Sequence, residues 1–153
     1  MAATRKMADV GLLGMTAPKR FGGSDADTVA LVTAIEEVAR GDASCALVLS
    51  MANSLSILPL MTFGTAAQQA QWKPPDRQRR MLCLVHADRA ARRVKPTAMK
   101  TVAERKGNRY ILRGTKQFIS LGSVSHLAFV LERSRRALCD CVIDGQDLRC
   151  RDM

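Results

Sequence analysis

The spacing of the apolar residues changes once along the chain, and this change constrains the fold more than any other feature. Over residues 28–72 apolar side chains recur every three or four positions, which indicates helices with one buried face. From residue 97 onward, short segments rich in branched and aromatic residues between turn signals indicate strands. Helices followed by strands favour two successive domains over an alternating α/β sheet. The predicted fold class is therefore α+β, with an all-α domain over residues 1–75 and a β domain over residues 76–153.

Local signals place the first long helix at residues 28–40. Asp25 or Asp27 is expected to cap it, because a carboxylate accepts hydrogen bonds from the free amides of the first turn. Gly41 is expected to end it. The apolar face of this helix is predicted to consist of Leu31, Val32, Ile35, Val38 and Ala39.

Asp42 is expected to cap a second helix that begins near Ala43. This helix is apolar nearly all round, which predicts a central and buried position. Pro59 should kink or restart it. Thr65 and Gln68 form a capping box for a short third helix.

Four segments are predicted to be strands, at residues 109–113, 117–120, 127–131 and 141–145. Residues 76–98 follow neither a helical nor a strand period.

The net charge of +10 is confined to one stretch. Residues 73–113 hold 13 Lys and Arg against 3 Asp and Glu, whereas the rest of the chain holds 11 of each sign. Such a stretch can bind phosphate, nucleic acid or anionic lipid, although most are simply solvated faces. Aromatic residues for stacking are few and no nucleic-acid-reading motif is present, so a nucleic-acid partner is not expected.

Composition indicates a globular protein, with 47% apolar and 25% charged residues. No apolar run approaches the roughly 20 residues of a spanning helix, and the N-terminus lacks an apolar signal segment. The sequence therefore predicts a cytoplasmic protein without a membrane partner. The cysteines are five in number and are expected to be reduced thiols. Three of them, Cys139, Cys141 and Cys150, suggest zinc, but no fourth ligand lies at a suitable spacing, so no metal site is predicted.

Four short segments occur in a distinctive order. Residues 11–23 contain G-L-L-G, A-P and F-G-G, and residues 34–44 read A-I-E-E-V-A-R-G-D-A-S. Residues 63–75 contain F-G-T, then Q, W and P-P, and residues 114–120 read G-T-K-Q-F-I-S. Together these segments resemble the acyl-CoA dehydrogenase family, whose patterns are G-L-x-G…P-x-x-[YF]-G-G, E-E-[IL]-A-R-x-D-A-S, F-G-[ST]-x-x-Q-x-x-x-[WY]-L-P-P and N-G-x-K-x-[WF]-I-[TS].

The resemblance implies an all-α N-terminal domain followed by an incomplete β-barrel domain, without the family's C-terminal helical bundle. It also implies FAD as cofactor and acyl-CoA as substrate, because the family oxidises the α,β carbon bond of an acyl-CoA thioester and passes a hydride to FAD. The family's catalytic carboxylate lies in the C-terminal bundle, so no catalytic residue is assigned here. Glu36 and Glu37 are helix-surface residues by pattern. If the source is eukaryotic, the resemblance implies a mitochondrial matrix protein.

Three residues are expected to bind the cofactor. Ser120 matches the family's Thr or Ser that contacts the flavin near N5, and Phe118 and Ile119 lie beside it in sequence. A buried strand with a satisfied hydroxyl explains the same pattern equally well.

The family's flavin-binding hallmark, L-T-E-P-x-A-G-S-[DN], is absent between Pro75 and Met99. Codons permitted for residues 76–95, read one base later, translate as I-A-S-G-E-C-C-A-W-C-M-L-T-E-P-H-A-G-S-N. This reading supplies the hallmark at the expected distance, and the original frame again suits the family from about residue 98. We therefore interpret residues 76–95 as an out-of-frame segment. In the chain as it stands, Arg92 and Arg93 replace a Gly-Ser turn that approaches phosphate closely, so FAD binding is expected to be impaired.

The sequence thus predicts a truncated, acyl-CoA dehydrogenase-like flavoprotein of fatty acid metabolism that is inactive alone. Two alternatives stay open. One is a basic protein that binds nucleic acid or an anionic surface through residues 77–113. The other is a helper subunit that assembles as a homo-oligomer or with a complementing chain that carries the C-terminal bundle.

Overall fold

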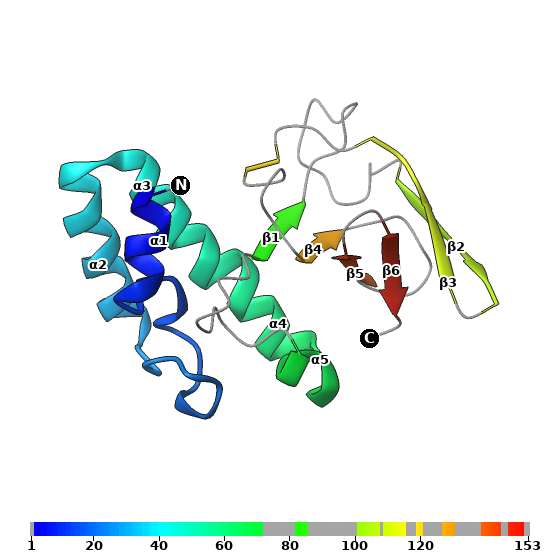
Figure 1. Cartoon of the computed structure of the whole chain (residues 1–153), viewed down its shortest axis with the longest axis horizontal. Coiled ribbons are helices and arrows are strands. Elements are labelled where there is room, and N and C mark those ends of the chain that lie inside the picture. The colour runs from blue at the N-terminus through cyan, green and yellow to red at the C-terminus, as the bar shows by residue number, and fades with distance from the viewer. Residues whose placement is uncertain are drawn as a thin grey trace. The chain divides into compact units, whose positions relative to one another are not determined.

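The computed structural model describes residues 2–71, 82–85, 101–107, 109–115, 119–120, 127–130, 139–144 and 147–151. Side chains are described for residues 2–71, 101–107, 111–115, 119–120 and Val130. The chain divides into two compact units, Met1–Leu82 and Cys83–Met153, and each is considered by itself (Figure 1). Helices form the first unit and strands the second, which confirms the α+β class.

The helical unit begins with three short helical segments. A long helix, a continuous run of three helical elements and one short helix follow them. In chain order its elements are α1 (Ala2–Asp9), η1 (Leu12–Gly14), η2 (Lys19–Phe21), α2 (Thr28–Gly41), α3 (Ala43–Ser50), η3 (Met51–Ile57), α4 (Leu58–Phe63) and α5 (Ala66–Gln71).

The helix ends follow the capping signals in the sequence. Asp27, and not Asp25, caps α2, because its carboxylate accepts a hydrogen bond from the Ala30 amide at 2.8 Å. The Asp42 carboxylate accepts hydrogen bonds from the amides of Ser44 and Cys45 at 2.7 and 3.1 Å. The predicted capping box before α5 is confirmed by a reciprocal pair of bonds between Thr65 and Gln68. These contacts satisfy amides that a helix cannot satisfy internally.

Replacing Asp42 with Asn is expected to make the stability of the helical unit less dependent on acid pH. Its hydrogen bonds from the Cys45 and Ser44 amides lower the pKa of the Asp42 carboxyl below its ordinary value of 3.8. A lowered pKa in the folded state stabilises the fold above the unfolded-state value, and this contribution is lost as the pH falls through the folded value. Asn caps about as well but does not titrate.

The measurement is circular dichroism during urea unfolding, at pH values from about 5 to about 2. The wild-type chain should lose more stability than Asp42→Asn over this range. Parallel curves for the two proteins would contradict the role given to the Asp42 cap.

Elements α3, η3 and α4 form one continuous helical run from Ala43 to Phe63 (Figure 1). Its middle segment, η3, is a π-helix, in which the Leu58 amide donates to the Asn53 carbonyl five residues earlier. Pro59 lies in the first turn of α4, where a missing amide N–H costs little. The proline therefore restarts the α-helix, as the sequence predicted.

The run Ala43–Phe63 is 21 residues long, with a mean hydropathy of 1.6 and a third of its most apolar window buried. Among the described residues it is the one helix long and apolar enough to cross a membrane, which corrects the expectation that no apolar run approaches that length. The core helix of a soluble protein passes the same test. The run is also less buried than predicted, because α1, η1 and α2 pack against only part of its surface.

The core of the helical unit lies where α1, η1 and α3 meet. Met7, Leu13 and Leu49 are buried there, and Ile35 and Val38 of α2 pack against them. Leu31 is also buried. The predicted apolar face of α2 is wrong at two positions, since Val32 and Ala39 are exposed.

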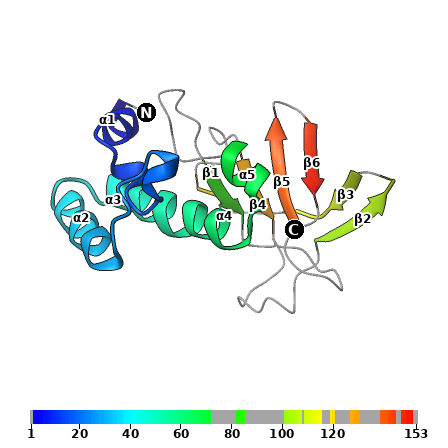
Figure 2. The ribbon, with the colours of Figure 1, turned by 90° about the horizontal axis from the view of Figure 1, so that it is seen from below.

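The described strands of the second unit form two sheets. Strands β1 (Leu82–Val85), β4 (Leu127–Val130), β5 (Cys139–Asp144) and β6 (Asp147–Arg151) pair in the order β1-β4-β5-β6, and β2 (Val102–Lys106) pairs with β3 (Arg109–Arg113). The pairings β2–β3, β4–β5 and β5–β6 are antiparallel. Figure 2 shows β2 and β3 as the two arms of a hairpin and β5 beside β6.

Three of the four predicted strands are confirmed as β3, β4 and β5, with ends shifted by a residue or two. The predicted strand at 117–120 is wrong at Ile119 and Ser120, which lie outside any strand, with Ser120 in a turn. Residues 117 and 118 lie outside the described residues. Strands β1, β2 and β6 are not predicted by the sequence. β1 interrupts a stretch without a clear period, β2 is rich in charged residues, and β6 alternates charged residues with Leu and Cys.

Candidate functional site

The segment expected to contact the cofactor leaves the β2–β3 hairpin at its open end. Val102 pairs with Arg113 as the last pair of the ladder, and Thr101 and Gly114 are the neighbours of these two residues outside the strands. A Cβ atom on Gly114 would collide with the Thr101 backbone and side chain, and Thr101 is 3% exposed. Glycine is therefore required at residue 114 by a close approach of the chain to itself.

The predicted cofactor-binding residues are only partly placed. Ile119 is half-buried and Ser120 is exposed in a turn, while Phe118 lies outside the described residues. The structure therefore does not support a buried strand at residues 119–120, which was the competing explanation of the pattern. It leaves Ile119 and Ser120 as predicted contacts.

The described side chains form no metal-binding group, and the two glutamates of α2 lie on its surface. Glu36 and Glu37 are exposed on α2, and Glu37 forms an ion pair with Arg40 at 3.4 Å, as expected of surface residues. No group of three or more His, Cys, Asp or Glu side chains in the described part of the chain is arranged to hold a metal ion. Burial raises the pKa of the Cys45 thiol, and the nearby Asp42 carboxylate adds to this effect.

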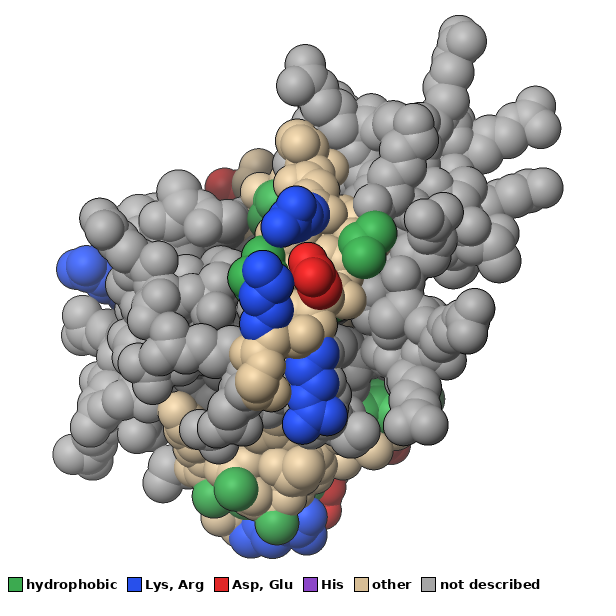
Figure 3. Space-filling model, turned by 90° about the vertical axis from the view of Figure 1, so that its right-hand side faces the viewer, with side chains coloured by type: hydrophobic (Ala, Val, Ile, Leu, Met, Phe, Trp, Pro, Cys, Tyr) green, Lys and Arg blue, Asp and Glu red, His purple; other side chains and the backbone are tan. Residues whose placement is uncertain are grey.

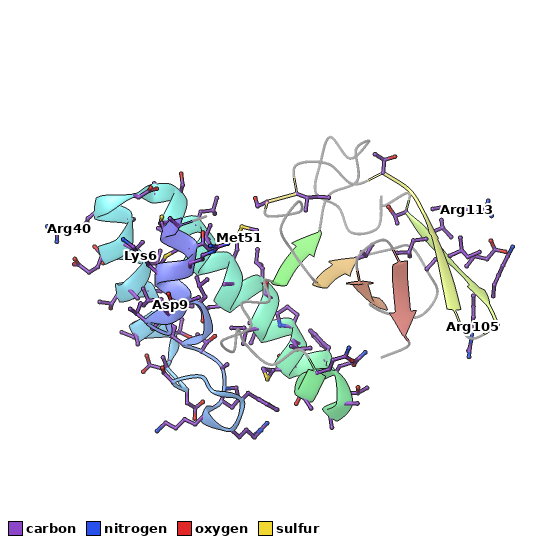
Figure 4. All side chains as sticks on the ribbon, viewed as in Figure 1. Lys6, Asp9, Arg40, Met51, Arg105 and Arg113 are labelled. Carbon is purple, nitrogen blue, oxygen red and sulfur yellow. The ribbon has the colours of Figure 1, made fainter. Side chains whose placement is uncertain are left out.

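Basic residues occur in both strands of the β2–β3 hairpin, and they lie on both of its faces. By strand alternation Lys106 and Arg113 share one face and Arg105 lies on the other. Arg113 forms an ion pair with Glu104 at 3.7 Å, and the Arg105 guanidinium donates to the Gly107 carbonyl. Figure 3 shows basic side chains next to an acidic one on this part of the surface, and Figure 4 labels Arg105 and Arg113. These contacts and the division between faces are typical of a solvated hairpin.

One buried polar contact was not anticipated from the sequence. Asn53 is 1% exposed, and its side-chain amide donates to the carbonyls of Leu12 and Leu49 at 2.9 and 3.0 Å. Its side-chain oxygen accepts from the amide and the hydroxyl of Thr16, both at 3.1 Å. Asn53 therefore connects η3 to the segment around η1, with all its hydrogen-bonding capacity used.

Comparisons with known proteins agree with these observations. A family model described as the N-terminal domain of acyl-CoA dehydrogenase matches residues 1–76. The chain is 31% identical to the mitochondrial short-chain specific acyl-CoA dehydrogenase of Homo sapiens, over 90% of this chain and 33% of that protein. It is 34% identical to the 3-(aryl)acrylate reductase of Clostridium sporogenes (strain ATCC 15579), over 85% of this chain and 34% of that protein.

A solved structure of glutaryl-CoA dehydrogenase from Mycobacterium smegmatis superposes with a TM-score of 0.84 at 29% identity, over 95% of this chain and 38% of that chain. The chain therefore belongs to the acyl-CoA dehydrogenase family, and its first 76 residues correspond to the N-terminal domain. It spans about a third of the length of the curated relatives it matches.

The family implies FAD, and the described residues do not fit it by themselves. The space beside Gly114 is filled by Thr101 of the same chain. Ile119 and Ser120 supply one half-buried apolar side chain and one exposed hydroxyl. A flavin dinucleotide also needs donors for its pyrophosphate, which proteins usually provide as a nest of backbone amides.

Proposed function

We propose that this chain is part of an FAD-dependent acyl-CoA dehydrogenase, which oxidises the α,β carbon bond of an acyl-CoA thioester, and that it does not catalyse this reaction alone. The observation that carries the proposal is the match of residues 1–76 to the family's N-terminal domain. The proposal includes a cytoplasmic location, or the mitochondrial matrix if the source is eukaryotic. The printed name of the human relative describes that protein as mitochondrial.

Titration of the purified chain with FAD is expected to show no tight binding. The chain has Arg92 and Arg93 where the family has a Gly-Ser turn. Arginine side chains attract a pyrophosphate but do not preform a backbone nest. A shift in the visible flavin spectrum that saturates at one equivalent with about 1 µM protein, which corresponds to roughly 8 kcal/mol, would contradict this expectation.

A helper subunit is the second candidate, and the helix Ala43–Phe63 favours it. This run contains no charged residue, yet Leu47 and Leu58 are 55% and 60% exposed. An apolar helix surface of this kind is typical of a contact with further polypeptide. The test is co-expression with the two thirds of a relative that this chain does not match, followed by an acyl-CoA oxidation assay with added FAD. Activity that appears only in the mixture supports a helper role.

The nucleic-acid alternative is not favoured, because two of the described arginines are engaged within the β2–β3 hairpin. Arg113 forms an ion pair with Glu104, and the Arg105 guanidinium donates to the Gly107 carbonyl. Phosphate contacts would give binding that weakens steeply as salt rises. Retention on immobilised DNA at about 0.15 M salt, where screening acts over about 8 Å, would revive this alternative.

A further inference from the structure

Sulfur-containing side chains are concentrated in the core of the helical unit. The buried cluster where α1, η1 and α3 meet includes Met7, and the partly buried Met15 and Cys45 pack against it. Met51 and Met61, on the helix run Ala43–Phe63, are half-buried but do not belong to this cluster (Figure 4 labels Met51). A thioether packs as an apolar group until it is oxidised to a sulfoxide, which is polar. The packing of this core therefore depends on the oxidation state of its methionines.

Met15 lies in the turn after η1, between two contacts that hold this part of the chain in place. Its carbonyl accepts a hydrogen bond from the Ala26 amide at 2.8 Å. The next residue, Thr16, donates from its amide and its hydroxyl to the Asn53 side chain, both at 3.1 Å. A change in the packing of the Met15 side chain therefore acts directly on the contact between this turn and η3.

Met15 is also more open to an oxidant in solution than the other sulfur groups of the cluster. Its side chain is half-buried, whereas Met7 is 7% exposed. The Cys45 thiol is a poorer target, because burial raises its pKa and the thiolate is the form that oxidants attack. A thioether does not titrate, so Met15 has no protection of this kind.

We propose that Met15 is an oxidation-sensitive residue, and that its oxidation by a hydroperoxide releases the η1 segment, residues 11–18, from the helix run Ala43–Phe63. The thioether sulfur takes one oxygen atom from the hydroperoxide as the O–O bond breaks, so methionine becomes its sulfoxide and hydrogen peroxide becomes water. The sulfoxide is polar and has no partner among the apolar side chains of the cluster, so its burial is unfavourable. The two states are a docked segment, with Thr16 on Asn53, and an undocked segment with this contact open to water.

The residues that follow the η1 segment provide a local measure of its release. Lys19 and Arg20 are exposed in η2, where the Phe21 amide donates to the Pro18 carbonyl at 2.9 Å. Trypsin cleaves after Lys and Arg, but only where the backbone can leave such hydrogen bonds, so the rate of cleavage reports the population of the open state. Arg40, at the end of α2, gives a reference for cleavage elsewhere in the same unit.

The test compares the full chain before and after treatment with hydrogen peroxide, with the oxidised residues identified by mass spectrometry. Cleavage after residues 19 and 20 should accelerate at least about tenfold on oxidation, relative to cleavage after Arg40. Met15→Leu nearly conserves volume and should be cleaved slowly both before and after treatment. Met61→Leu, in α4 and outside the cluster, should respond to peroxide as the wild type does. Methionine sulfoxide reductases should return the oxidised wild type to its original rate.

Met15→Gln provides a second variant, because it places a polar side chain of similar length at this position without any oxidant. It should be cleaved as fast as the oxidised wild type. Three results would overturn the proposal: equal rates for the oxidised and untreated wild type, a response to peroxide that persists in Met15→Leu, or a response that is lost in Met61→Leu or Cys45→Ser. Slow cleavage of untreated Met15→Gln would also contradict it. The readout contains no flavin or acyl-CoA, so its outcome is independent of the proposed enzymatic function.

Discussion

Replacing residues 76–95 with I-A-S-G-E-C-C-A-W-C-M-L-T-E-P-H-A-G-S-N is expected to raise the affinity of the chain for FAD at least about a hundredfold, or 3 kcal/mol. The inserted sequence is what permitted codons for these residues give when read one base later. It exchanges Arg92 and Arg93 for a Gly-Ser turn, in which backbone amides and a hydroxyl can approach the pyrophosphate closely. Hydrogen bonds to a charged group contribute about 1.5–3 kcal/mol each, so two or three of them are enough for this effect.

Fluorescence quenching of FAD, measured on the wild-type and replaced chains side by side, gives the two affinities. The control is a replacement of the same composition with the order of its last nine residues scrambled, which keeps the loss of positive charge. Residues 76–95 hold 7 Lys and Arg against 2 Asp and Glu, so the control separates charge from sequence order. Equal affinities for the replaced and scrambled chains would refute the assignment of these residues to a flavin cradle.

The coding sequence provides an independent check of the same interpretation. Nucleotides across codons 76–98 should permit L-T-E-P-H-A-G-S-N in the shifted frame. Codons that cannot give this reading would end the out-of-frame interpretation, whatever the binding data show.

The features that the sequence predicted correctly in the helical unit depend on neighbours within a few residues. The Asp42 cap reaches amides two and three positions ahead, and the Thr65–Gln68 box spans three positions. Interactions at this range depend on residue type and spacing, which are visible in a linear sequence. The same holds for β3, which contains Tyr110, Ile111 and Leu112 in succession.

The features that were missed depend on residues far apart. The apolar residues of α2 and of the run Ala43–Phe63 indicated which helices form. They did not indicate how much of each helix surface a neighbouring element covers. Val32 and Leu58 were therefore expected to be buried, but both are exposed. The pairing of Cys141 with Cys150 is set by strand register, which alternation along one strand does not specify. The family patterns identified the chain but could not place Ile119 and Ser120, whose setting depends on the rest of the β unit.

Asn53 is the clearest case, because its partners lie up to 41 residues away. In the sequence it is one polar residue within an apolar helix, which predicts nothing specific. In the structure it joins η3 to Leu12 and Thr16 on the segment around η1. That segment contains the G-L-L-G pattern, so the contact holds η1 against the longest helical run among the described residues.

Asn53→Ala is expected to reduce the free energy of unfolding of the helical unit by about 3 kcal/mol. The change deletes four hydrogen bonds and leaves the Leu12 carbonyl and the Thr16 amide without this partner. It also leaves a cavity at a side chain that is almost fully buried. Urea unfolding followed by circular dichroism at a helix-sensitive wavelength measures the effect.

Ser54→Ala is the matched control, because Ser54 is the next residue and its hydroxyl donates only to the Ser50 carbonyl one turn earlier. The loss of this local, half-buried bond should cost less than about 1 kcal/mol. A loss of similar size in the two variants would mean that the helix is sensitive to any polar deletion there. A large loss in Asn53→Ala alone would instead show that the long-range contact of Asn53 with Leu12 and Thr16 determines how the η1 segment packs against η3.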